Sequence, residues 1–281
     1  MRPDWLRFCR DVSADVEAVL RRHPTRDDRE PVVGQGRGGD DTTVIDSEAE
    51  QAAVARLEAL ERDGISFRLV SEELGERRFG TGDSPWVVVV DPIDGSLNAK
   101  RGLPFFCVSI AFADGPSLDD VAFGYVRDFG SGEEWVAERG AGATVNGRPL
   151  GGVRPKPRLG IVDLEATTAG LVAEAAGRLD GHVGRIRMMG ALALAMCQLA
   201  DGRVDGVATL KPSRSVDLAA AALVVRESGA ALHTLDSDPL PLDLDARTRA
   251  VAARDDEWCT TLAGLVYADA GQPAGAAKPS R

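Results

Sequence analysis

The feature that most constrains this chain is a run of four valines followed at once by acidic and turn residues, in residues 86–102, WVVVVDPIDGSLNAKRG. A short apolar run bounded by turn residues predicts a fully buried strand. Asp91 and Asp94 follow it in a predicted turn, and Gly95 and Ser96 lead into a predicted helix start. Free backbone N–H groups at a helix start bind anions, so we expect a divalent metal on the two carboxylates and a phosphate on the amides. The alternative is an Asx-rich turn that only closes the strand.

The composition indicates an ordinary globular protein with one large or two medium domains in 281 residues. A net charge of −11 argues against nucleic acid and anionic membranes as partners. A small phosphorylated substrate remains compatible, because a metal and local arginines reverse the field inside one cleft. No apolar run reaches membrane-spanning length, and the charged N-terminal segment favours a cytoplasmic protein. Buried, reduced side chains are predicted for the four scattered cysteines, Cys9, Cys107, Cys197 and Cys259.

The first half of the chain predicts two helices and then a run of strands. Apolar residues at helical spacing mark a helix over 4–22, and a second helix ends at Gly64, with Asp46 as a candidate cap. The segment 65–70 alternates like a strand and ends beside Glu72. Asn146-Gly147 is a strong hairpin-turn signal. Further strands are expected at 105–113, 121–129 and 133–140, and residues 151–158 read as a linker.

The second half predicts strands at 159–166 and 203–210, and helices at 167–179 and 190–202. A further helix begins with Ser215 as candidate N-cap, carries Asp217 in its first turn and ends before Gly229. The strand expected next is 231–244 with its loop, and a last helix covers 257–268. The chain therefore divides into an N-terminal domain, 1–150, a C-terminal domain, 151–268, and a disordered tail, 269–281.

Four carboxylates stand at the ends of predicted elements: Glu72, Asp91, Asp94 and Asp217. Bringing like charges together without a cation costs several kcal/mol or forces protonation, so their convergence would imply bound cations. Oxygen ligands select hard ions, and Mg²⁺ is the common choice beside phosphates. For Asp217 taken alone, the alternative role is to complement the helix dipole.

Four segments in order resemble the inositol monophosphatase family: VSEELG, DPIDGSLNAKRGLPFFCVSIAFA, AERGAGATVNGRPL and SVDLAAAALVVRESGA. They are most similar to its archaeal-type branch, whose members act as both inositol monophosphatases and fructose-1,6-bisphosphatases. The resemblance covers residues 34–230. It implies an α/β protein built as an alternating αβαβα sandwich, a homodimer, and two or three Mg²⁺ ions in each active site.

The resemblance also implies roles for matching residues. The implied metal ligands are Glu72, Asp91, the carbonyl of Ile93, Asp94 and Asp217, with the amides of Gly95 and Ser96 on the phosphate. The segment GGDDTTVID resembles the family's D-x-x-T-x-x-D element, which places Asp46 where a carboxylate and the Ser96 hydroxyl orient the attacking water. The family usually has threonine at Ser96. Because a serine rotamer is less constrained, a somewhat slower enzyme is expected.

The implied activity is hydrolysis of a sugar or inositol phosphate, inositol 1-phosphate or fructose 1,6-bisphosphate, by a metal-activated water without a covalent protein nucleophile. Candidate contacts to the alcohol or to a second phosphate are Lys100, Arg101, Arg185, Arg187 and Arg214, for which surface or interdomain ion pairing is the alternative. The competing enzyme readings are phosphatases for 3'-phosphoadenosine 5'-phosphate or histidinol phosphate. A different class is a degenerate relative that only binds a metal or a partner protein.

Overall fold

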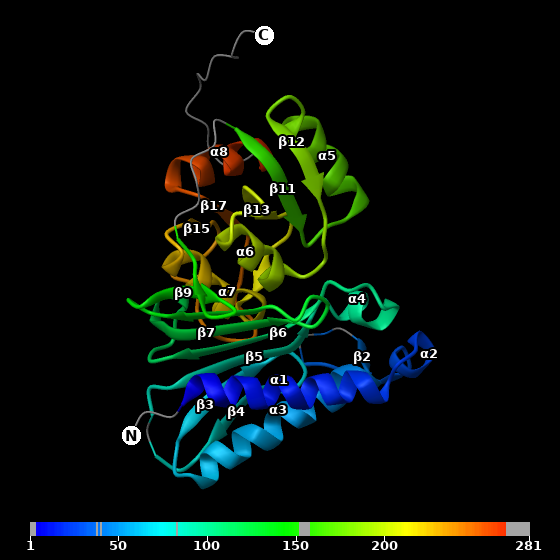
Figure 1. The fold of residues 1–281 in the computed structure, drawn as a ribbon, viewed down its shortest axis with the longest axis vertical. Helices are drawn as coiled ribbons and strands as arrows, with labels where there is room; N and C mark the ends of the chain where they lie inside the picture. The colour runs from blue at the N-terminus through cyan, green and yellow to red at the C-terminus, as the bar shows by residue number, and fades with distance from the viewer. Residues whose placement is uncertain (1–3, 38, 40, 83, 152–157, 268–281) are drawn as a thin grey trace.

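The computed structural model describes residues 4–37, 39, 41–82, 84–151 and 158–267. In these residues helices and sheets alternate in five stacked layers (Figure 1). The αβαβα sandwich expected from the sequence is therefore confirmed. The predicted disordered tail, 269–281, and most of the predicted linker, 151–158, lie outside the described residues.

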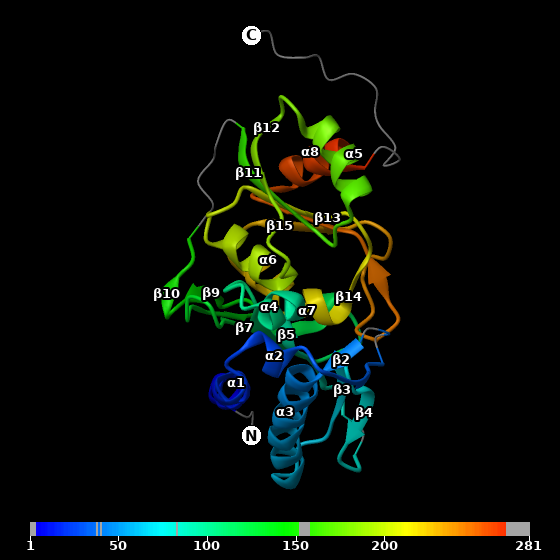
Figure 2. The same ribbon diagram turned by 90° about the vertical axis from the view of Figure 1, so that its right-hand side faces the viewer.

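Two long helices form the first layer and cover one face of an eight-stranded sheet (Figure 2). Their apolar side chains recur at helical spacing and face the sheet, as Phe8, Val12 and Val16 do in the first helix. The strand order is β10-β9-β8-β7-β6-β5-β3-β4, and every pair is antiparallel except β3 with β5. The bounds are α1 (Trp5–Arg22), α3 (Val44–Arg62), β3 (Phe67–Ser71), β4 (Gly75–Phe79), β5 (Val87–Asp94), β6 (Cys107–Ala113), β7 (Val121–Asp128), β8 (Glu134–Glu138), β9 (Gly142–Val145) and β10 (Arg148–Pro149).

Short elements complete this part of the chain: α2 (Arg26–Arg29), the hairpin strands β1 (Val32–Gln35) and β2 (Asp41–Thr43), α4 (Ser96–Arg101) and the 3₁₀ turn η1 (Leu118–Asp120).

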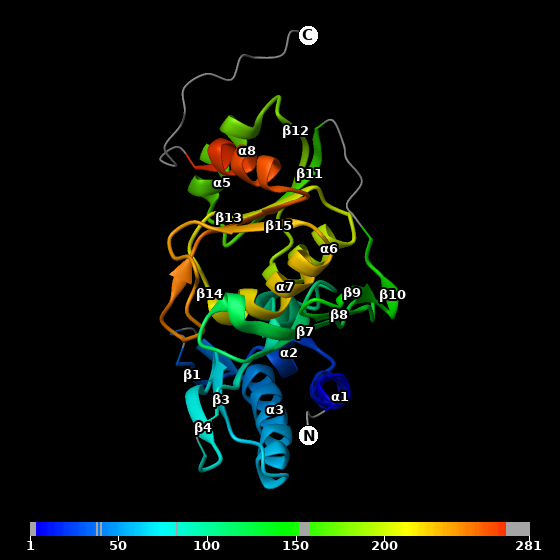
Figure 3. The same ribbon diagram turned by 90° about the vertical axis from the view of Figure 1, so that its left-hand side faces the viewer.

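The middle layer consists of two helices between the large sheet and a five-stranded sheet, and a pair of helices covers the far face of that second sheet (Figure 3). The middle helices are apolar on nearly all sides, as burial between two sheets requires. The second sheet has the order β12-β11-β13-β17-β15. The bounds are α6 (Leu192–Ala200) and α7 (Ser215–Glu227) for the middle layer, β11 (Leu159–Glu165), β12 (Val183–Arg187), β13 (Gly206–Thr209), β15 (Ala231–Thr234) and β17 (Ala250–Ala253) for the sheet, α5 (Ala169–Leu179) and α8 (Asp256–Val266) for the outer helices, and β14 (Ser213–Arg214) with β16 (Arg247–Thr248) for a separate strand pair.

One buried cluster joins the two sheets through the middle helices. It contains Val89 of the large sheet, Leu194 and Val224 of α6 and α7, and Val207 of the second sheet. The predicted domains, 1–150 and 151–268, therefore share a hydrophobic core. The division of the chain into these two domains remains a prediction.

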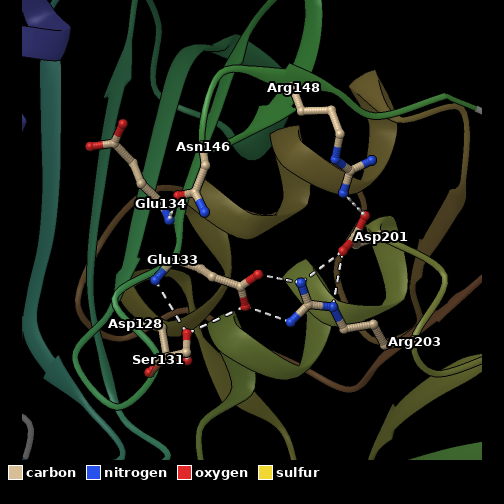
Figure 4. Close-up of polar contacts among 8 residues, drawn as sticks. All are labelled: Asp128, Ser131, Glu133, Glu134, Asn146, Arg148, Asp201 and Arg203. Carbon is tan, nitrogen blue, oxygen red and sulfur yellow. Dashed lines mark hydrogen bonds and ion pairs between the residues drawn. The ribbon is translucent and has the colours of Figure 1, made fainter.

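A network of charged side chains also crosses between the two halves (Figure 4). Arg203, just after α6, donates from both terminal nitrogens to Glu133 at 2.5 Å, and its Nε lies 2.9 Å from Asp201. Arg148 of β10 donates to the other oxygen of Asp201 at 2.9 Å. The network links the turn before β8 to the end of α6. Its bidentate geometry makes it more effective than an isolated surface pair.

Most predicted elements are present, and several local expectations are confirmed. Asn146 and Gly147 both have positive φ in the turn between β9 and β10, as a two-residue hairpin requires. All four cysteines are free and buried. Among the described residues, no helix is both long enough and apolar enough to cross a membrane.

Three boundaries differ from the expectations. Helix α3 begins at Val44 with Thr43 as its N-cap, so Asp46 lies inside the first turn and is not the cap. Ser215 is the first residue of α7, and its hydroxyl donates to the carbonyl of Asp243 at 2.7 Å. Strand β5 extends through Asp94, where a turn was expected after Val90. Strands β12 and β17 and helix α2 were not predicted.

Candidate active site

An irregularity in the pairing of β5 directs the side chains of Asp91 and Asp94 into the same cavity. The pairing of β5 with β6 shifts between Asp91, opposite Ser109, and Asp94, opposite Cys107. In a regular strand, residues three apart point to opposite faces, whereas an extra residue on one strand re-aims the side chains beyond it. Both carboxylates line the same cavity. Asp91 also accepts a hydrogen bond from the amide of Ile93 at 3.0 Å, so the Asx-type turn coexists with the clustering of acids.

Only glycine fits where β5 meets α4. Gly95 has φ of +86°, and a β-carbon there would lie 2.9 Å from the Ala191 side chain and 3.0 Å from the Gly190 carbonyl. The next residue, Ser96, begins α4 and donates its hydroxyl to the carbonyl of Ile93 at 2.8 Å. This hydrogen bond restricts the serine rotamer that the sequence alone left free.

Acids distant in the sequence meet beside this turn. Glu72 follows β3, Asp91 lies on β5 and Asp217 is in the first turn of α7, and one carboxylate oxygen from each lies within 4.8 Å of the others. Burial, together with the charges of Glu72, Asp94 and Asp217, raises the pKa of Asp91 well above its usual range. Burial, and then Asp217, raises the pKa of Asp94 to about 7. The residues therefore fit a cation that takes oxygen ligands, because such a cation offsets this repulsion.

Asp94 also ties the large sheet to the middle layer. Its Oδ2 accepts the backbone N–H of Ala193 at 2.8 Å and the thiol of Cys107 at 3.6 Å. Nearby, the Asn98 side chain of α4 donates to the carbonyls of Phe105 at 2.8 Å and Met189 at 2.7 Å. The acidic site is therefore built across the contact between two layers.

One carboxylate oxygen of Asp46 accepts hydrogen bonds, and the other has no hydrogen-bond partner. Its Oδ2 accepts hydrogen bonds from the Thr43 amide at 2.9 Å and the Thr43 hydroxyl at 2.7 Å, and lies 2.8 Å from Nζ of Lys100. Its Oδ1 is buried without a hydrogen-bond partner. Since Asp46 lines the acidic cavity, this oxygen can accept a hydrogen bond from a molecule bound there.

The five predicted basic contacts separate into two groups. Lys100 and Arg214 line the cavity, and Arg214 Nη2 lies 2.5 Å from Glu72 Oε1. The other three are not among its lining residues. Arg101 pairs with Glu30 at 2.8 Å, while Arg185 and Arg187 donate to backbone carbonyls of their own strand.

The cavity has a volume of about 430 Å³ and a wall that sequence reasoning missed. Among its further lining residues are Asp41, Glu73, Glu165, Ala166, Thr167 and Gly190. Glu165 is the last residue of β11, and its Oε1 accepts the amides of Met189 at 3.1 Å and Gly190 at 2.8 Å. Burial, and then Asp163, raises its pKa to about 8. The available signal was an acid at the end of a predicted strand, the same signal that singled out Glu72 and Asp91.

Helix α3 places a second buried acid, Glu50, one turn beyond Asp46. Glu50 is 6% exposed, and both of its oxygens lie 2.7 Å from the hydroxyl of Ser71, the last residue of β3. Burial raises its pKa to about 7, with Glu73 contributing. Because Ser71 precedes Glu72, this contact fixes the end of the strand that presents a candidate ligand.

We predict that Glu50→Gln becomes more stable relative to the wild type as the pH rises from about 4.5 to 7. A carboxyl with a raised pKa contributes stability at low pH that is lost as the pH rises through the folded-state value, whereas the amide does not titrate. The difference in free energy of unfolding should change by up to about 3 kcal/mol across this range. Urea unfolding at several pH values measures it, with the surface variant Glu58→Gln as control. A constant difference between Glu50→Gln and wild type would refute the prediction.

The fold and the site define a layered α/β protein with an acidic cavity whose carboxylates could hold a cation. The sequence model of the inositol monophosphatase family matches residues 7–268. A fructose-1,6-bisphosphatase/inositol-1-monophosphatase from Methanocaldococcus jannaschii is 32% identical over 247 residues, which cover 87% of this chain and 92% of that protein. A protein of the same name from Archaeoglobus fulgidus is 31% identical over 258 residues, which cover 90% of this chain and 94% of that protein.

A solved structure described as an inositol monophosphatase–fructose 1,6-bisphosphatase superposes with a TM-score of 0.80 and 28% identity, covering 94% of this chain and 100% of that one. The chain belongs to the inositol monophosphatase family. Since the proteins of this family are phosphatases, the chain is assigned to the hydrolases. The match extends well beyond the residues 34–230 that carried the resemblance.

Proposed function

We propose that the protein is a Mg²⁺-dependent phosphomonoesterase that hydrolyses a sugar or inositol phosphate. The observation that carries the proposal is the gathering of Glu72, Asp91 and Asp217 around one point. The names of its relatives, which combine fructose-1,6-bisphosphatase and inositol-1-monophosphatase, support the substrate class.

The residues proposed to hold two or three Mg²⁺ ions are Glu72, Asp91, the carbonyl of Ile93, Asp94 and Asp217. When bound, these ions supply charge neutralisation for the phosphate and acidify a coordinated water. The carboxylates that would hold the cations come from the large sheet, the residue after β3 and α7, and the buried position of Asp91 and Asp94 would exclude bulk water from that side.

The chain's own residues are proposed to orient the phosphate and the water. The amides at Gly95 and Ser96, where α4 begins without a side-chain cap, would donate to phosphate oxygens. Asp46 is held by Thr43 and Lys100, so that its unpaired Oδ1 would accept a hydrogen bond from the attacking water and orient it. The Ser96 hydroxyl donates to Ile93 and keeps its lone pairs available to the same water. Phosphoryl transfer depends largely on such positioning, so no covalent nucleophile is assigned.

Release of inorganic phosphate from a panel of esters tests this function. With Mg²⁺ we expect hydrolysis of inositol 1-phosphate or a fructose phosphate above that of 3'-phosphoadenosine 5'-phosphate and histidinol phosphate, and none with EDTA. Preference for either of the last two compounds would favour the corresponding alternative enzyme. Absence of phosphate release from every ester would favour a degenerate relative.

The family resemblance also leads us to propose a homodimer. Sedimentation velocity of the purified protein measures its mass, and a monomer at micromolar concentration would contradict the proposal.

A further inference from the structure

The residues just before α6 lie directly against the turn that begins α4. A β-carbon on Gly95 would lie 3.0 Å from the carbonyl oxygen of Gly190, so the two backbones are in contact. The Asn98 side chain donates a hydrogen bond to the carbonyl of Met189 at 2.7 Å. Residues 189–191, which we call the supporting segment, therefore hold this turn from the side of the second half of the chain.

Glu165 binds the supporting segment from another direction. Its carboxyl is buried, and its Oε1 accepts the amides of Met189 at 3.1 Å and Gly190 at 2.8 Å. Gly190 itself is exposed and has φ of +84°, so apolar packing contributes little to holding it in place. Since one oxygen accepts two successive amides, Glu165 fixes the orientation of both peptide groups.

The backbone beside Glu165 is strained. Glu165 is the last residue of β11, and the next residue, Ala166, has φ of +52°, a left-handed conformation that is unfavourable for alanine. Such a conformation persists only where the surrounding structure holds it firmly. The strand therefore ends sharply at a residue whose carboxyl is held in one position beside the cavity.

The position of Glu165 differs from that of the proposed metal ligands. Among the described residues, the acids whose oxygens all lie within 4.8 Å of one another are Glu72, Asp91 and Asp217, and Glu165 does not belong to this group. Its Oε1 already serves two backbone amides. The geometry thus fits a support for the backbone better than a ligand for a cation.

We propose that Glu165 is a positioning residue for the turn at Gly95 and Ser96, which it keeps aimed into the cavity by holding the supporting segment. This inference rests on the proposed phosphatase function, in which the amides of that turn bind the phosphate. A displacement of about 1 Å in a binding group can lower a rate by about a hundredfold, so a loosened support reduces activity. The role requires an acceptor at the right distance but no negative charge, because the amides that it holds are neutral.

Glu165→Gln and Glu165→Asp separate the length of the side chain from its charge. Glutamine keeps the length and an acceptor oxygen without the charge, whereas aspartate keeps the charge on a side chain that is shorter by one methylene. With Mg²⁺ and the ester that the wild type hydrolyses fastest, kcat/KM of Glu165→Gln should stay within about threefold of the wild type. For Glu165→Asp it should fall by at least about tenfold.

The matched control is Glu174→Asp, which makes the same change at an exposed position of α5 and should behave like the wild type. If Glu165→Asp kept its activity and Glu165→Gln lost it, the carboxyl would act through its charge and the proposal would be wrong. Equal activity of the two variants would also overturn it. If Glu165→Asp failed to fold while Glu165→Gln folded, the contact would support the whole fold and not this turn, which is a further contradiction.

Hydrogen–deuterium exchange of the metal-free protein tests the same role without catalysis. Helix α4 starts at the turn, where the amide of Ala99 donates to the carbonyl of Gly95 at 3.0 Å. In Glu165→Asp we expect faster exchange in α4 as well as in the supporting segment, and in Glu165→Gln wild-type exchange in both. Faster exchange in the supporting segment alone would overturn the proposal. If the wild type hydrolysed no ester, the proposed function would fail, whereas this measurement would still decide whether Glu165 supports the turn.

Discussion

Asp94→Asn is expected to lose phosphatase activity by more than about a hundredfold while keeping its fold. Replacing a group that only orients a metal ligand typically lowers metal affinity or activity by about 10- to 100-fold. Loss of a direct ligand should lower activity further. The asparagine oxygen can still accept the N–H of Ala193, which lies 2.8 Å from Asp94 Oδ2, so the contact with the middle layer is retained. Phosphate release at saturating Mg²⁺ measures the loss, and circular dichroism checks the fold.

The stability of the same variant separates loss of function from unfolding. The pKa of Asp94 is raised to about 7, so the ionised carboxylate lowers stability above that pH in the absence of metal. An amide has no such cost. In EDTA at pH 8, Asp94→Asn should therefore melt at the wild-type temperature or higher, and the exposed Asp119→Asn should match the wild type in both activity and stability. Near-normal turnover of Asp94→Asn would remove Asp94 from the metal site.

Saturating Mg²⁺ is expected to raise the melting temperature by at least about 5 °C over the EDTA-treated protein. A ligand at a hundred times its Kd stabilises the folded state by about 2.7 kcal/mol, and each kcal/mol corresponds to about 2–4 °C for a chain of this size. The cause is relief of repulsion among the oxygens of Glu72, Asp91 and Asp217, which lie within 4.8 Å of one another. Differential scanning calorimetry measures the shift without any substrate.

Asp217→Asn supplies the matched control for this experiment. It removes one of the three clustered carboxylates, so the rise in melting temperature caused by Mg²⁺ should fall to less than half of the wild-type rise. Asp119→Asn should show the full wild-type rise. Equal melting temperatures with Mg²⁺ and EDTA in the wild type would contradict the proposed metal site, whatever the activity measurements gave.

The layered fold was predicted from the resemblance to the family, whereas many individual helices and strands were predicted from strong local signals. Four consecutive valines predict a buried strand, Asn146-Gly147 predicts a hairpin, and the first turn of a helix favours Asp217. The bulge between Asp91 and Asp94 could not be predicted, since it depends on the pairing of β5 with β6. The roles of the site residues remain proposals, although the structure brings several of them together.

The sequence did not show which basic side chains line the cavity. Lys100 and Arg101 are adjacent, yet Lys100 lines the cavity and Arg101 pairs with Glu30, because successive helical residues point in different directions. Glu165 was overlooked because its place in the cavity depends on a tertiary contact, with the amides of Met189 and Gly190 before α6. Strand β17 was missed because AVAA, residues 250–253, is buried on both faces and has no alternating pattern.

The hydrogen bonds from Ala193 to Asp94 and from Asn98 to Met189 have a consequence for how this protein can change over evolution. The proposed metal ligands come from both halves of the chain, so exchanging one half for that of a relative would have to preserve these hydrogen bonds. We expect a hybrid that lost these hydrogen bonds to misplace Asp94 relative to the rest of the proposed metal site.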